Sequence, residues 1–378
     1  MKTTRLFSIL AAVALSLISC GPEVGEAVTV DFDVTQQDFE ASIASIELMP
    51  LQRDSLLRLG YAPSLYTSDG DWFLVERDPT AEKDFRNYKL YRYDSKGRFL
   101  NAIGQKGKRL DEIFLIDNIQ FRDASIIVFS REPQGGGEKA ITYDYEGNVL
   151  GAKHFEFADG QSLLLKDGVL TYYGHGDRHG KEGRLMLYSE EGVQRKAFLT
   201  ERTASMNFKS NSDVLLPTGR GVIVFDTFSN KLWCYNAGKL KPFLEFDLGD
   251  YTIDDEFFAI KDRGESYRHL SARQYAMIHR YAENEEARLV EVPVHTADKK
   301  RFCLYGFDSG NGWRWFRSEA PFEGTIQLLD GKQAIALVEP AQLLSMNETL
   351  RGRLKNPEVL EGMVPEDNYV IARITFTE

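Results

Sequence analysis

Four short segments of the chain share one pattern, in which an apolar, tyrosine-containing run leads through a glycine turn into another apolar run. The turn glycines are Gly97, Gly147, Gly192 and Gly238, which are 45 to 50 residues apart. Glycine tolerates the left-handed backbone of a tight turn, so each segment is expected to form a β-hairpin. A hairpin that recurs at this period, with further strand-like runs between its copies, predicts a β-propeller or a related array.

The length of the chain indicates how many propeller blades it forms. The strand-like runs fall into groups of roughly four, and at ~55–60 residues per group the chain after position 28 accommodates six blades. Five or seven blades also fit. We expect Val28–Val34 and Tyr369–Phe376 to share one blade, because this closes the ring and removes open sheet edges. Residues 28–378 are therefore expected to form one all-β domain, a six-bladed propeller of four-stranded antiparallel blades.

Two regions depart from the strand pattern. Asp254–Glu286 is charged and aromatic, and the apolar spacing over Tyr267–Tyr281 is helix-like. This region is either a helical insertion or a long decorated loop. Pro340–Leu350 is a second helix candidate, with proline at its start and Gly352 near its end.

The amino terminus has the form of an export signal that ends at a cysteine. Lys2 and Arg5 precede an apolar run, Leu6–Ile18, that is too short to span a bilayer. Small Ser19 then precedes Cys20, which looks like the lipobox of bacterial lipoproteins, where the cysteine thiol receives a diacylglycerol. We expect residues 1–19 to be removed and residues 20–27 to tether the body to a membrane. An ordinary secretory signal with a chance cysteine is the alternative.

The net charge limits the partners of the mature chain. The formal charge is −11, and loss of Lys2 and Arg5 with the signal takes it to −13. An acidic body does not neutralise phosphates, so no nucleic-acid partner is expected. It is also repelled by anionic membrane surfaces, so the lipid on Cys20 must supply the membrane contact. Gly21, rather than aspartate, follows Cys20, which favours the outer membrane, with the body facing either the periplasm or the exterior.

The remaining cysteines, Cys234 and Cys303, each lie inside a strand-like run. Two separate buried thiols are favoured, and a disulfide between them is the alternative in an oxidising compartment. The sequence contains no C-x-x-C pair, so a thiol redox motif or a cysteine zinc site is not expected.

The densest polar cluster is the segment from Gly174 to Gly180. His175, Asp177 and His179 in this segment offer imidazole and carboxylate ligands for a divalent metal. A glycine-rich surface loop between two strands is the favoured interpretation, and no cofactor is expected.

Two further clusters are candidates for ligand binding. Trp313 and Trp315 lie on one face of a predicted strand, with Arg314 on the other face, and two aligned indoles could stack on sugar rings. Packing between adjacent blades is the favoured alternative. A second, basic cluster could meet an anionic ligand, although a solvated loop is the simpler interpretation; its members are Lys106, Lys108 and Arg109.

An acidic run is the weak candidate for catalysis. Paired carboxylates hydrolyse glycosides when they are held about 5 to 9 Å apart. Adjacent acids are more typical of a surface charge run. The residues concerned are Asp254, Asp255, Glu256, Asp262, Glu265 and His269. The sequence contains no G-x-S-x-G, H-E-x-x-H or Walker-type phosphate motif.

Three regions resemble the six-bladed β-propeller lipoproteins of Bacteroidetes, a family related in form to NHL-repeat propellers. They are Tyr93–Gly107 with its Ile-Gly-x-x-Gly turn, the opening Ile43–Leu51, and the ending Glu366–Phe376. The family commonly continues this turn with Gly-Pro-Gly-Glu, whereas Lys108–Glu112 stands here and keeps only the acidic residue. The resemblance implies a fold and a location, and it implies no general catalytic activity.

We therefore expect a lipid-anchored, non-catalytic binding module for a protein, peptide or glycan, because a stiff ring of blades lowers the ordering cost of its loops. An enzyme acting on a polysaccharide or lactone, as lyase or hydrolase, is the first alternative. A structural accessory of an outer-membrane uptake complex is the second.

Overall fold

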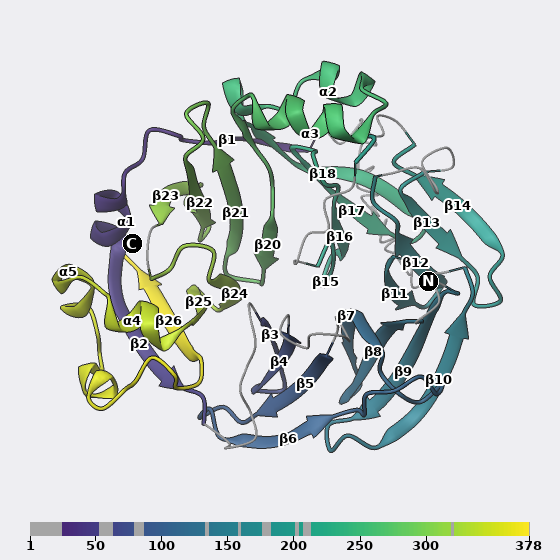
Figure 1. Cartoon of the computed structure of the whole chain (residues 1–378), viewed down its shortest axis with the longest axis horizontal. Coiled ribbons are helices and arrows are strands. Elements are labelled where there is room, and N and C mark those ends of the chain that lie inside the picture. Colours follow the sequence, from purple (N-terminus) through teal and green to yellow (C-terminus); the bar gives the residue numbers. More distant parts are fainter. Residues whose placement is uncertain are drawn as a thin grey trace, which may run out of the picture.

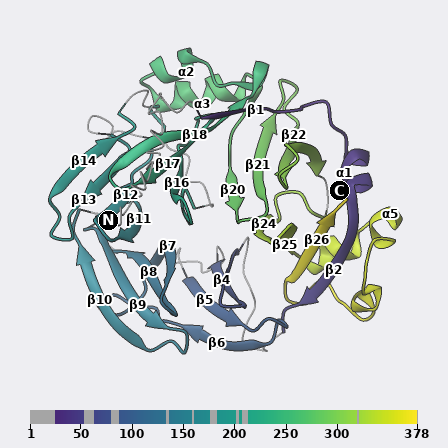
Figure 2. The same ribbon diagram turned by 180° about the vertical axis from the view of Figure 1, so that it is seen from behind.

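A computed structural model describes residues 25–52, 63–78, 87–132, 136–157, 160–175, 183–200, 204–206, 213–318 and 321–377. These residues form six small, mainly antiparallel sheets arranged in a ring, as Figures 1 and 2 show from its two sides. The prediction of a six-bladed β-propeller is confirmed.

The first three blades are formed by consecutive strands. Blade one comprises β3 (Ser64–Ser68), β4 (Asp71–Asp78), β5 (Asn87–Tyr93) and β6 (Phe99–Ile103). Blade two comprises β7 (Leu115–Arg122), β8 (Ser125–Arg131), β9 (Glu138–Asp144) and β10 (Val149–Phe155). Blade three comprises β11 (Gln161–Leu165), β12 (Gly168–Tyr172), β13 (Leu185–Tyr188) and β14 (Gln194–Phe198).

The other three blades each include an additional or distant strand. Blade four comprises β15 (Leu215–Thr218), β16 (Gly221–Phe225), β17 (Lys231–Asn236), β18 (Lys239–Asp247) and β1 (Glu26–Thr29). Blade five comprises β20 (Arg280–Glu283), β21 (Arg288–His295), β22 (Arg301–Asp308), β23 (Arg314–Ser318) and the short β19 (Tyr275–Ala276). Blade six comprises β24 (Ile326–Asp330), β25 (Gln333–Val338), β26 (Val370–Phe376) and β2 (Ile43–Pro50).

The ring closes through blade six, where strands from the two ends of the chain pair. The closing amino-terminal strand is β2, which pairs antiparallel with β26, with Ile46 opposite Ile374 and Leu48 opposite Ala372. The prediction that Val28–Val34 closes the ring is therefore wrong. Ile46 and Leu48 are buried in the core of blade six. The ring is therefore closed by the segment whose apolar side chains complete that core.

Strand β1 has a different role from the one predicted for its segment. It adds to the outer strand of blade four as a parallel fifth strand, with Val28 opposite Phe246. Val28 and Val30 are buried in the core that blades three, four and five share. Glu26 and Ala27, which were expected to belong to the tether, are therefore part of a strand.

The helices lie outside the blades. They are α1 (Gln36–Ser42), α2 (Asp255–Ala259), α3 (Arg263–Ser271), α4 (Pro340–Leu344), α5 (Glu348–Arg351) and the 3-10 turns η1 (Gly249–Tyr251) and η2 (Pro357–Leu360). None of the described helices is both long and apolar enough to cross a membrane.

Both helix predictions were right in place and wrong in detail. The region Asp254–Glu286 does carry a helical insertion, but α3 ends at Ser271 and Tyr275 already belongs to a strand. The predicted helix at Pro340–Leu350 is two short helices, because Asn347 accepts a hydrogen bond from the Leu350 amide and so begins α5.

The antiparallel pairing gives the ring two unlike sides. In each blade, the start of the first strand, the end of the second and the start of the third lie on one side of the ring. The connection from the preceding blade arrives on the same side. We call this the crossover side. The turns from first to second strand and from third to fourth strand lie opposite, on the hairpin side. The first strands line the centre of the ring (Figure 1).

The four repeated glycines occupy the third-to-fourth-strand hairpins of blades one to four, as predicted. Gly97, Gly147, Gly192 and Gly238 have φ values of 77°, 91°, 85° and 74°. Other residues rarely adopt this left-handed backbone, which explains why glycine recurs at these turns.

The two described cysteines lie in different blades and are free thiols, as favoured. Cys303 in β22 is buried, whereas Cys234 in β17 is only half-buried. The alternative of a disulfide between them is excluded.

Candidate functional site

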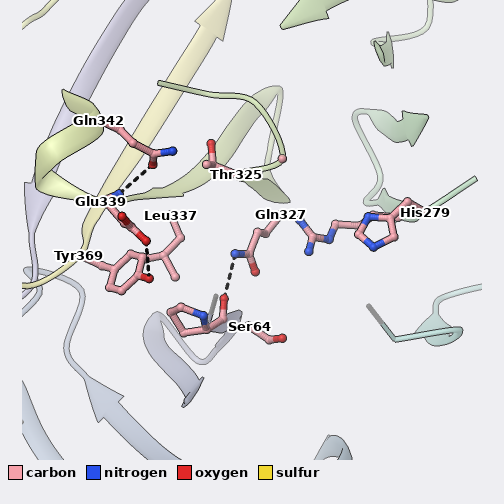
Figure 3. Close-up of a pocket in the computed structure, with 11 residues that line it drawn as sticks. Ser64, His279, Thr325, Gln327, Leu337, Glu339, Gln342 and Tyr369 are labelled. Atoms are coloured by element: carbon pink, nitrogen blue, oxygen red, sulfur yellow. Dashed lines mark hydrogen bonds between the residues drawn. The ribbon is translucent and has the colours of Figure 1, made fainter. Parts of the chain in front are cut away.

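A pocket of about 250 Å³ lies on the crossover side, where the first strands of blades five, six and one begin. Strand β24 contacts both β20 and β3, so the three first strands lie side by side at this point. Figure 3 shows the lining residues. The polar residues that line the pocket include Ser64, His279, Arg280, Gln327, Glu339 and Tyr369.

One wall of the pocket is formed where β25 ends and α4 begins. Side chains two residues apart share a face of a strand, so Leu337 and Glu339 both reach the pocket. Glu339 is the N-cap residue of α4, and Pro340 fixes the start of that helix. The Tyr369 hydroxyl donates a hydrogen bond of 3.1 Å to Oε1 of Glu339 (Figure 3).

The opposite wall carries a histidine that is held by a buried carboxylate. Nδ1 of His279 lies 3.0 Å from Oε2 of Glu291, which is only 3% exposed. Nη1 of Arg280 lies 3.7 Å from the same oxygen and donates to the carbonyl of Ile326. Burial alone would raise the pKa of Glu291, but the charge of Arg280 and the His279 hydrogen bond outweigh it and lower that pKa. Glu291 is therefore a carboxylate, and Nδ1 of His279 donates to it.

The floor between these walls is fixed by Gln327, whose side-chain amide joins two blades. Its Nε2 donates to the carbonyl of Pro63 at 3.1 Å, and its Oε1 accepts from the Leu65 amide at 2.8 Å. Both ends of the amide are thus used by the backbone of blade one. Thr325 beside it has a buried Oγ1 with no hydrogen-bond partner among the described residues. The pocket therefore combines a rigid frame with an unsatisfied hydroxyl.

The acidic run at Asp254 forms a separate cluster, away from this pocket. Asp254, Glu256 and His269 offer ligand atoms within 4.8 Å of one another, close enough to share a metal ion. Arg273, however, pairs with both carboxylates. Asp254 also accepts from the Phe257 amide at 2.9 Å as the N-cap of α2. A guanidinium therefore already balances the charge that a metal would neutralise.

The rest of the acidic run serves the insertion in a similar way. Asp262 is the N-cap of α3 and accepts from the Glu265 amide at 2.8 Å. Asp255 and Glu256 lie in the first turn of α2, where acidic residues are stabilised by the helix dipole. These contacts agree with the structural rather than the catalytic interpretation of the run.

His175 is a core histidine in the described structure. It is 2% exposed, its Nδ1 accepts from the Ala204 amide at 3.0 Å, and its Nε2 donates to the Thr227 carbonyl at 2.7 Å. Both ring nitrogens are thus engaged by the protein. Asp177 and His179, the other two members of the proposed metal cluster, lie outside the described residues.

Beside His175 lies a buried ion pair that sequence analysis did not identify. Arg184 donates to both oxygens of Asp226, at 2.9 and 2.7 Å, and the Tyr172 hydroxyl donates at 2.8 Å. Burial alone would raise the pKa of Asp226, but hydrogen bonds from His175 and Arg184 outweigh it and lower the pKa to about 2. This pair ties the second-to-third-strand connections of blades three and four together.

The basic cluster lies on the crossover connection between blades one and two. Lys106, Lys108 and Arg109 are exposed, and Arg109 pairs with Glu112 at 2.9 Å. Glu112, the acidic residue kept from the family turn, folds over Gly107, where a Cβ would collide with its carboxylate. The connection is therefore organised from within, and part of its positive charge is already balanced.

The two tryptophans lie between blades four and five. Trp313 and Trp315 stack with ring centroids 6.1 Å apart, and both pack edge-on against Phe246 of β18. Trp315 is 7% exposed. These are the contacts of the inter-blade packing interpretation.

The pocket residues were not singled out from the sequence. His279 and Arg280 lie in the region where the strand pattern fails, and Glu291 is a polar residue inside an apolar strand. The Glu339-Pro340 pair marks the start of a helix, but nothing local indicates that it faces His279. The packing of blade six against blade five brings these residues together, and closure of the ring adds those of blade one.

A comparison with curated proteins finds no match. Among solved structures, the chain is similar to a Bacteroides fragilis protein described as exported, with a TM-score of 0.71 and 15% identity over 94% of this chain and 100% of that one. It is also aligned with BamB from Moraxella catarrhalis, with a TM-score of 0.36 and 10% identity over 89% of this chain and 91% of that one. The first likeness shows the fold, and the second carries no argument.

The strongest comparison is with a family model. It matches residues 28–375, which include nearly the whole ring from β1 to β26. The predicted resemblance is thus confirmed for the six-bladed fold, while its NHL-like and lipoprotein character stay predictions. The chain belongs to the family described as Domain of unknown function (DUF4934).

Proposed function

We propose that this protein is a lipid-anchored propeller outside the cytoplasm that binds a protein, peptide or glycan without catalysing a reaction. The observation that carries this proposal is the crossover-side pocket, to which three blades contribute. The hydrogen bonds of Gln327 and the Tyr369–Glu339 hydrogen bond hold the lining of the pocket in place. Little conformational entropy would therefore be lost from the protein when a ligand binds.

The test of binding uses the mature protein purified in detergent. Peptide and glycan collections are screened by thermal shift, and hits are titrated against the wild type and a Ser64→Trp variant, whose larger side chain occupies the pocket. We expect a hit whose affinity falls at least tenfold in the variant and which is recovered chemically unchanged. A hit that the protein converts to a product would contradict a non-catalytic role.

An enzyme is the second candidate, and the His279–Glu291 pair is the observation that favours it. A carboxylate that accepts from Nδ1 of a histidine orients the ring and fixes the tautomer that a general base requires. A His279→Asn variant separates the two candidates. Binding without turnover predicts that affinity changes little, whereas a polysaccharide or lactone lyase or hydrolase predicts that turnover is abolished.

The proposed membrane anchor is the diacylglycerol on Cys20. We expect a Cys20→Ser variant to move from the membrane fraction to the soluble fraction and to lose the lipid mass in mass spectrometry. Cys234→Ser is the matched control and leaves fractionation unchanged. Recovery of an unmodified Cys20 from wild-type membranes would contradict the anchor, and the outer membrane is the location we propose.

The first described strand supports an orientation for the anchored ring. Arg288 donates to both oxygens of Glu26, at 2.6 and 3.0 Å, and Trp313 Nε1 donates at 3.3 Å. Arg288 begins β21 and Asp308, its other partner, ends β22, so this network lies on the hairpin side. The chain thus enters blade four from that side, and we propose that the crossover side with its pocket faces away from the membrane.

An accessory role in an outer-membrane uptake complex is the remaining alternative. It predicts an exposed apolar patch, yet the exposed large apolar side chains in the described ranges come from several different blades and connections. They are Leu100, Leu110, Val149, Leu150, Val193, Tyr267 and Val364. Co-purification of the same partner from native membranes would favour the accessory role, and repeated recovery of the protein alone would count against it.

A further inference from the structure

The pocket contains one carboxylate, Glu339, whose charge no side chain in the described part of the chain balances. Among the described residues, Glu339 accepts a side-chain hydrogen bond from the neutral Tyr369 hydroxyl, and no lysine, arginine or histidine forms an ion pair with it. Glu339 is half-buried, so solvent screens it only in part.

The other charges of the pocket offset one another. The guanidinium of Arg280 lies beside the buried carboxylate of Glu291, 3.7 Å away, so this pair contributes no net charge. His279 donates Nδ1–H to the same carboxylate. Among the described lining residues, the unbalanced charge is therefore the negative charge of Glu339.

The groups around Glu339 suit an ammonium group on an aliphatic stem. Thr325 has a buried hydroxyl oxygen without a hydrogen-bond partner, and an ammonium has three donors to offer to such acceptors. Leu337 and the ring of Tyr369 line the same wall, and Pro63 adds an apolar surface from blade one. Apolar walls that lead to a carboxylate match a side chain with a methylene stem and a charged head.

The charge of the whole protein acts in the same direction. A formal charge of −11, or −13 without the signal segment, attracts cationic ligands and raises their rate of association at low salt. An anionic ligand would have to overcome this field and would also meet Glu339.

We propose that the pocket binds the ammonium group of a lysine side chain, and hence that the ligand is a basic peptide segment. The ammonium pairs with Glu339, and the methylene stem lies against Leu337 and Pro63. This inference rests on the proposed binding function and assigns the ligand class of the same pocket.

The experiment titrates the mature protein in detergent with three probes, followed by NMR or calorimetry. The probes are N-acetyl-lysine methylamide, N-acetyl-norleucine methylamide, which has no ammonium group, and glucosamine. We expect the lysine probe to bind at least tenfold more tightly than the norleucine probe at low salt. Its affinity should fall as salt rises, because mobile ions screen a partly exposed charge. This comparison needs no variant and so does not depend on one that folds.

A pair of matched variants locates the effect. Glu339→Gln keeps the size of the side chain and an acceptor for Tyr369 but removes the charge. We expect the affinity of this variant for the lysine probe to be at least tenfold lower than that of wild type. Glu358→Gln removes one charge from an exposed position in η2 on the same connection, outside the pocket lining, and should leave affinity within twofold of wild type.

The failures of the two proposals are distinguishable. Equal affinity for the lysine and norleucine probes, tighter binding of glucosamine, or no effect of Glu339→Gln on a bound lysine probe would overturn the lysine assignment. Binding at the pocket would then still stand. If neither a probe nor a library ligand binds more weakly to Ser64→Trp than to wild type, the binding function itself fails together with the assignment.

Discussion

The hairpin side and the crossover side of the ring are held together by different means. On the hairpin side, blades one to four repeat one glycine turn between their third and fourth strands. On the crossover side, the connections differ from blade to blade, and they carry the insertions α2–α3 and α4–α5, the buried ion pair Arg184–Asp226 and the pocket.

The difference shows where the fold is specified by backbone geometry and where by particular charges. A repeated turn needs only a residue that tolerates positive φ, and it can be copied from blade to blade. A buried charge needs a partner at a defined distance, which a connection of unique sequence supplies. We therefore expect the two sides to respond differently to substitution, to charge removal and to pH.

The largest effect is expected from removing a buried charge on the crossover side. Asp226→Asn leaves the Arg184 guanidinium buried without its counter-charge, and breaking a buried pair in this way costs about 3–5 kcal/mol. The free energy of unfolding in urea at pH 7 measures the loss. Tyr172→Phe, which removes one hydrogen bond to the same carboxylate but leaves the ion pair, is the control and should cost about 1.5–3 kcal/mol. Equal costs for the two variants would show that the charge is not what holds this side.

The hairpin side offers a matched pair of glycines. Gly97 and Gly238 have similar φ values of 77° and 74°, but a Cβ on Gly97 would lie 2.7 Å from the Pro50 carbonyl, whereas a Cβ on Gly238 would meet nothing within 4 Å. Gly238→Ala should therefore cost about 1–2 kcal/mol for its backbone alone. Gly97→Ala should cost a further ~1–3 kcal/mol for the forced contact with the closing strand. Thermal and urea unfolding measure the difference, and equal losses would mean that closure adds no constraint at this turn.

A third test uses pH, and two buried carboxylates on the crossover side should respond with opposite sign. Burial first, and then the charge of Asp117, raise the pKa of Glu138 well above its usual value, with Arg131 opposing. The folded state then holds a proton that the unfolded state has released, so stability falls as pH rises above about 4.5, the unfolded value. For Asp226, whose pKa is lowered to about 2, stability is present above about 3.8 and lost as pH falls towards 2.

The variant Glu138→Gln isolates the first of these effects. Relative to wild type, its free energy of unfolding should increase as pH rises from 5 towards 8, because glutamine does not titrate whereas the wild type loses stability when its unfolded state releases the Glu138 proton. Glu361→Gln, at an exposed position, is the control and should follow the wild-type pH profile. A constant difference between Glu138→Gln and wild type over this range would show that Glu138 does not titrate differently in the folded protein.

The sequence predicts the hairpin side better than the crossover side, for reasons that particular residues illustrate. Gly97 and its three counterparts identified the hairpins because the φ of a turn is a local property. The closing strand was assigned wrongly because both amino-terminal segments alternate, and only pairing with β26 selects Ile43–Pro50. Strand β20 is not recognisable from the local sequence, because Arg280 and Tyr281 belong to the segment with helix-like apolar spacing.

The pocket could not be predicted, because its charged and polar groups meet across strands and connections rather than within one local segment. Glu291 lies inside an apolar strand, and its link to the pocket is the hydrogen bond with His279, which directly precedes β20. Glu339 gains its neighbour Tyr369 only because a connection with two helices returns to the same blade. No local pattern encodes these contacts, whereas the caps at Asp254 and Asp262 have a recognisable local form.

The smallest effect on stability is expected at the exposed cluster of the α2–α3 insertion, although this cluster also lies on the crossover side. Asp254 is paired with His269 and Arg273, but the side chain of Arg273 is 53% exposed. Asparagine is as good an N-cap as aspartate, so Asp254→Asn keeps the helix cap and loses only a screened ion pair, at a cost of about 0.5–1 kcal/mol. Because Arg273 already balances Asp254 and Glu256, added Zn²⁺ or Mg²⁺ should leave the Tm of wild type unchanged. A rise in Tm that Asp254→Asn abolishes would instead show that the metal displaces Arg273, and that the crossover side carries a second ligand site.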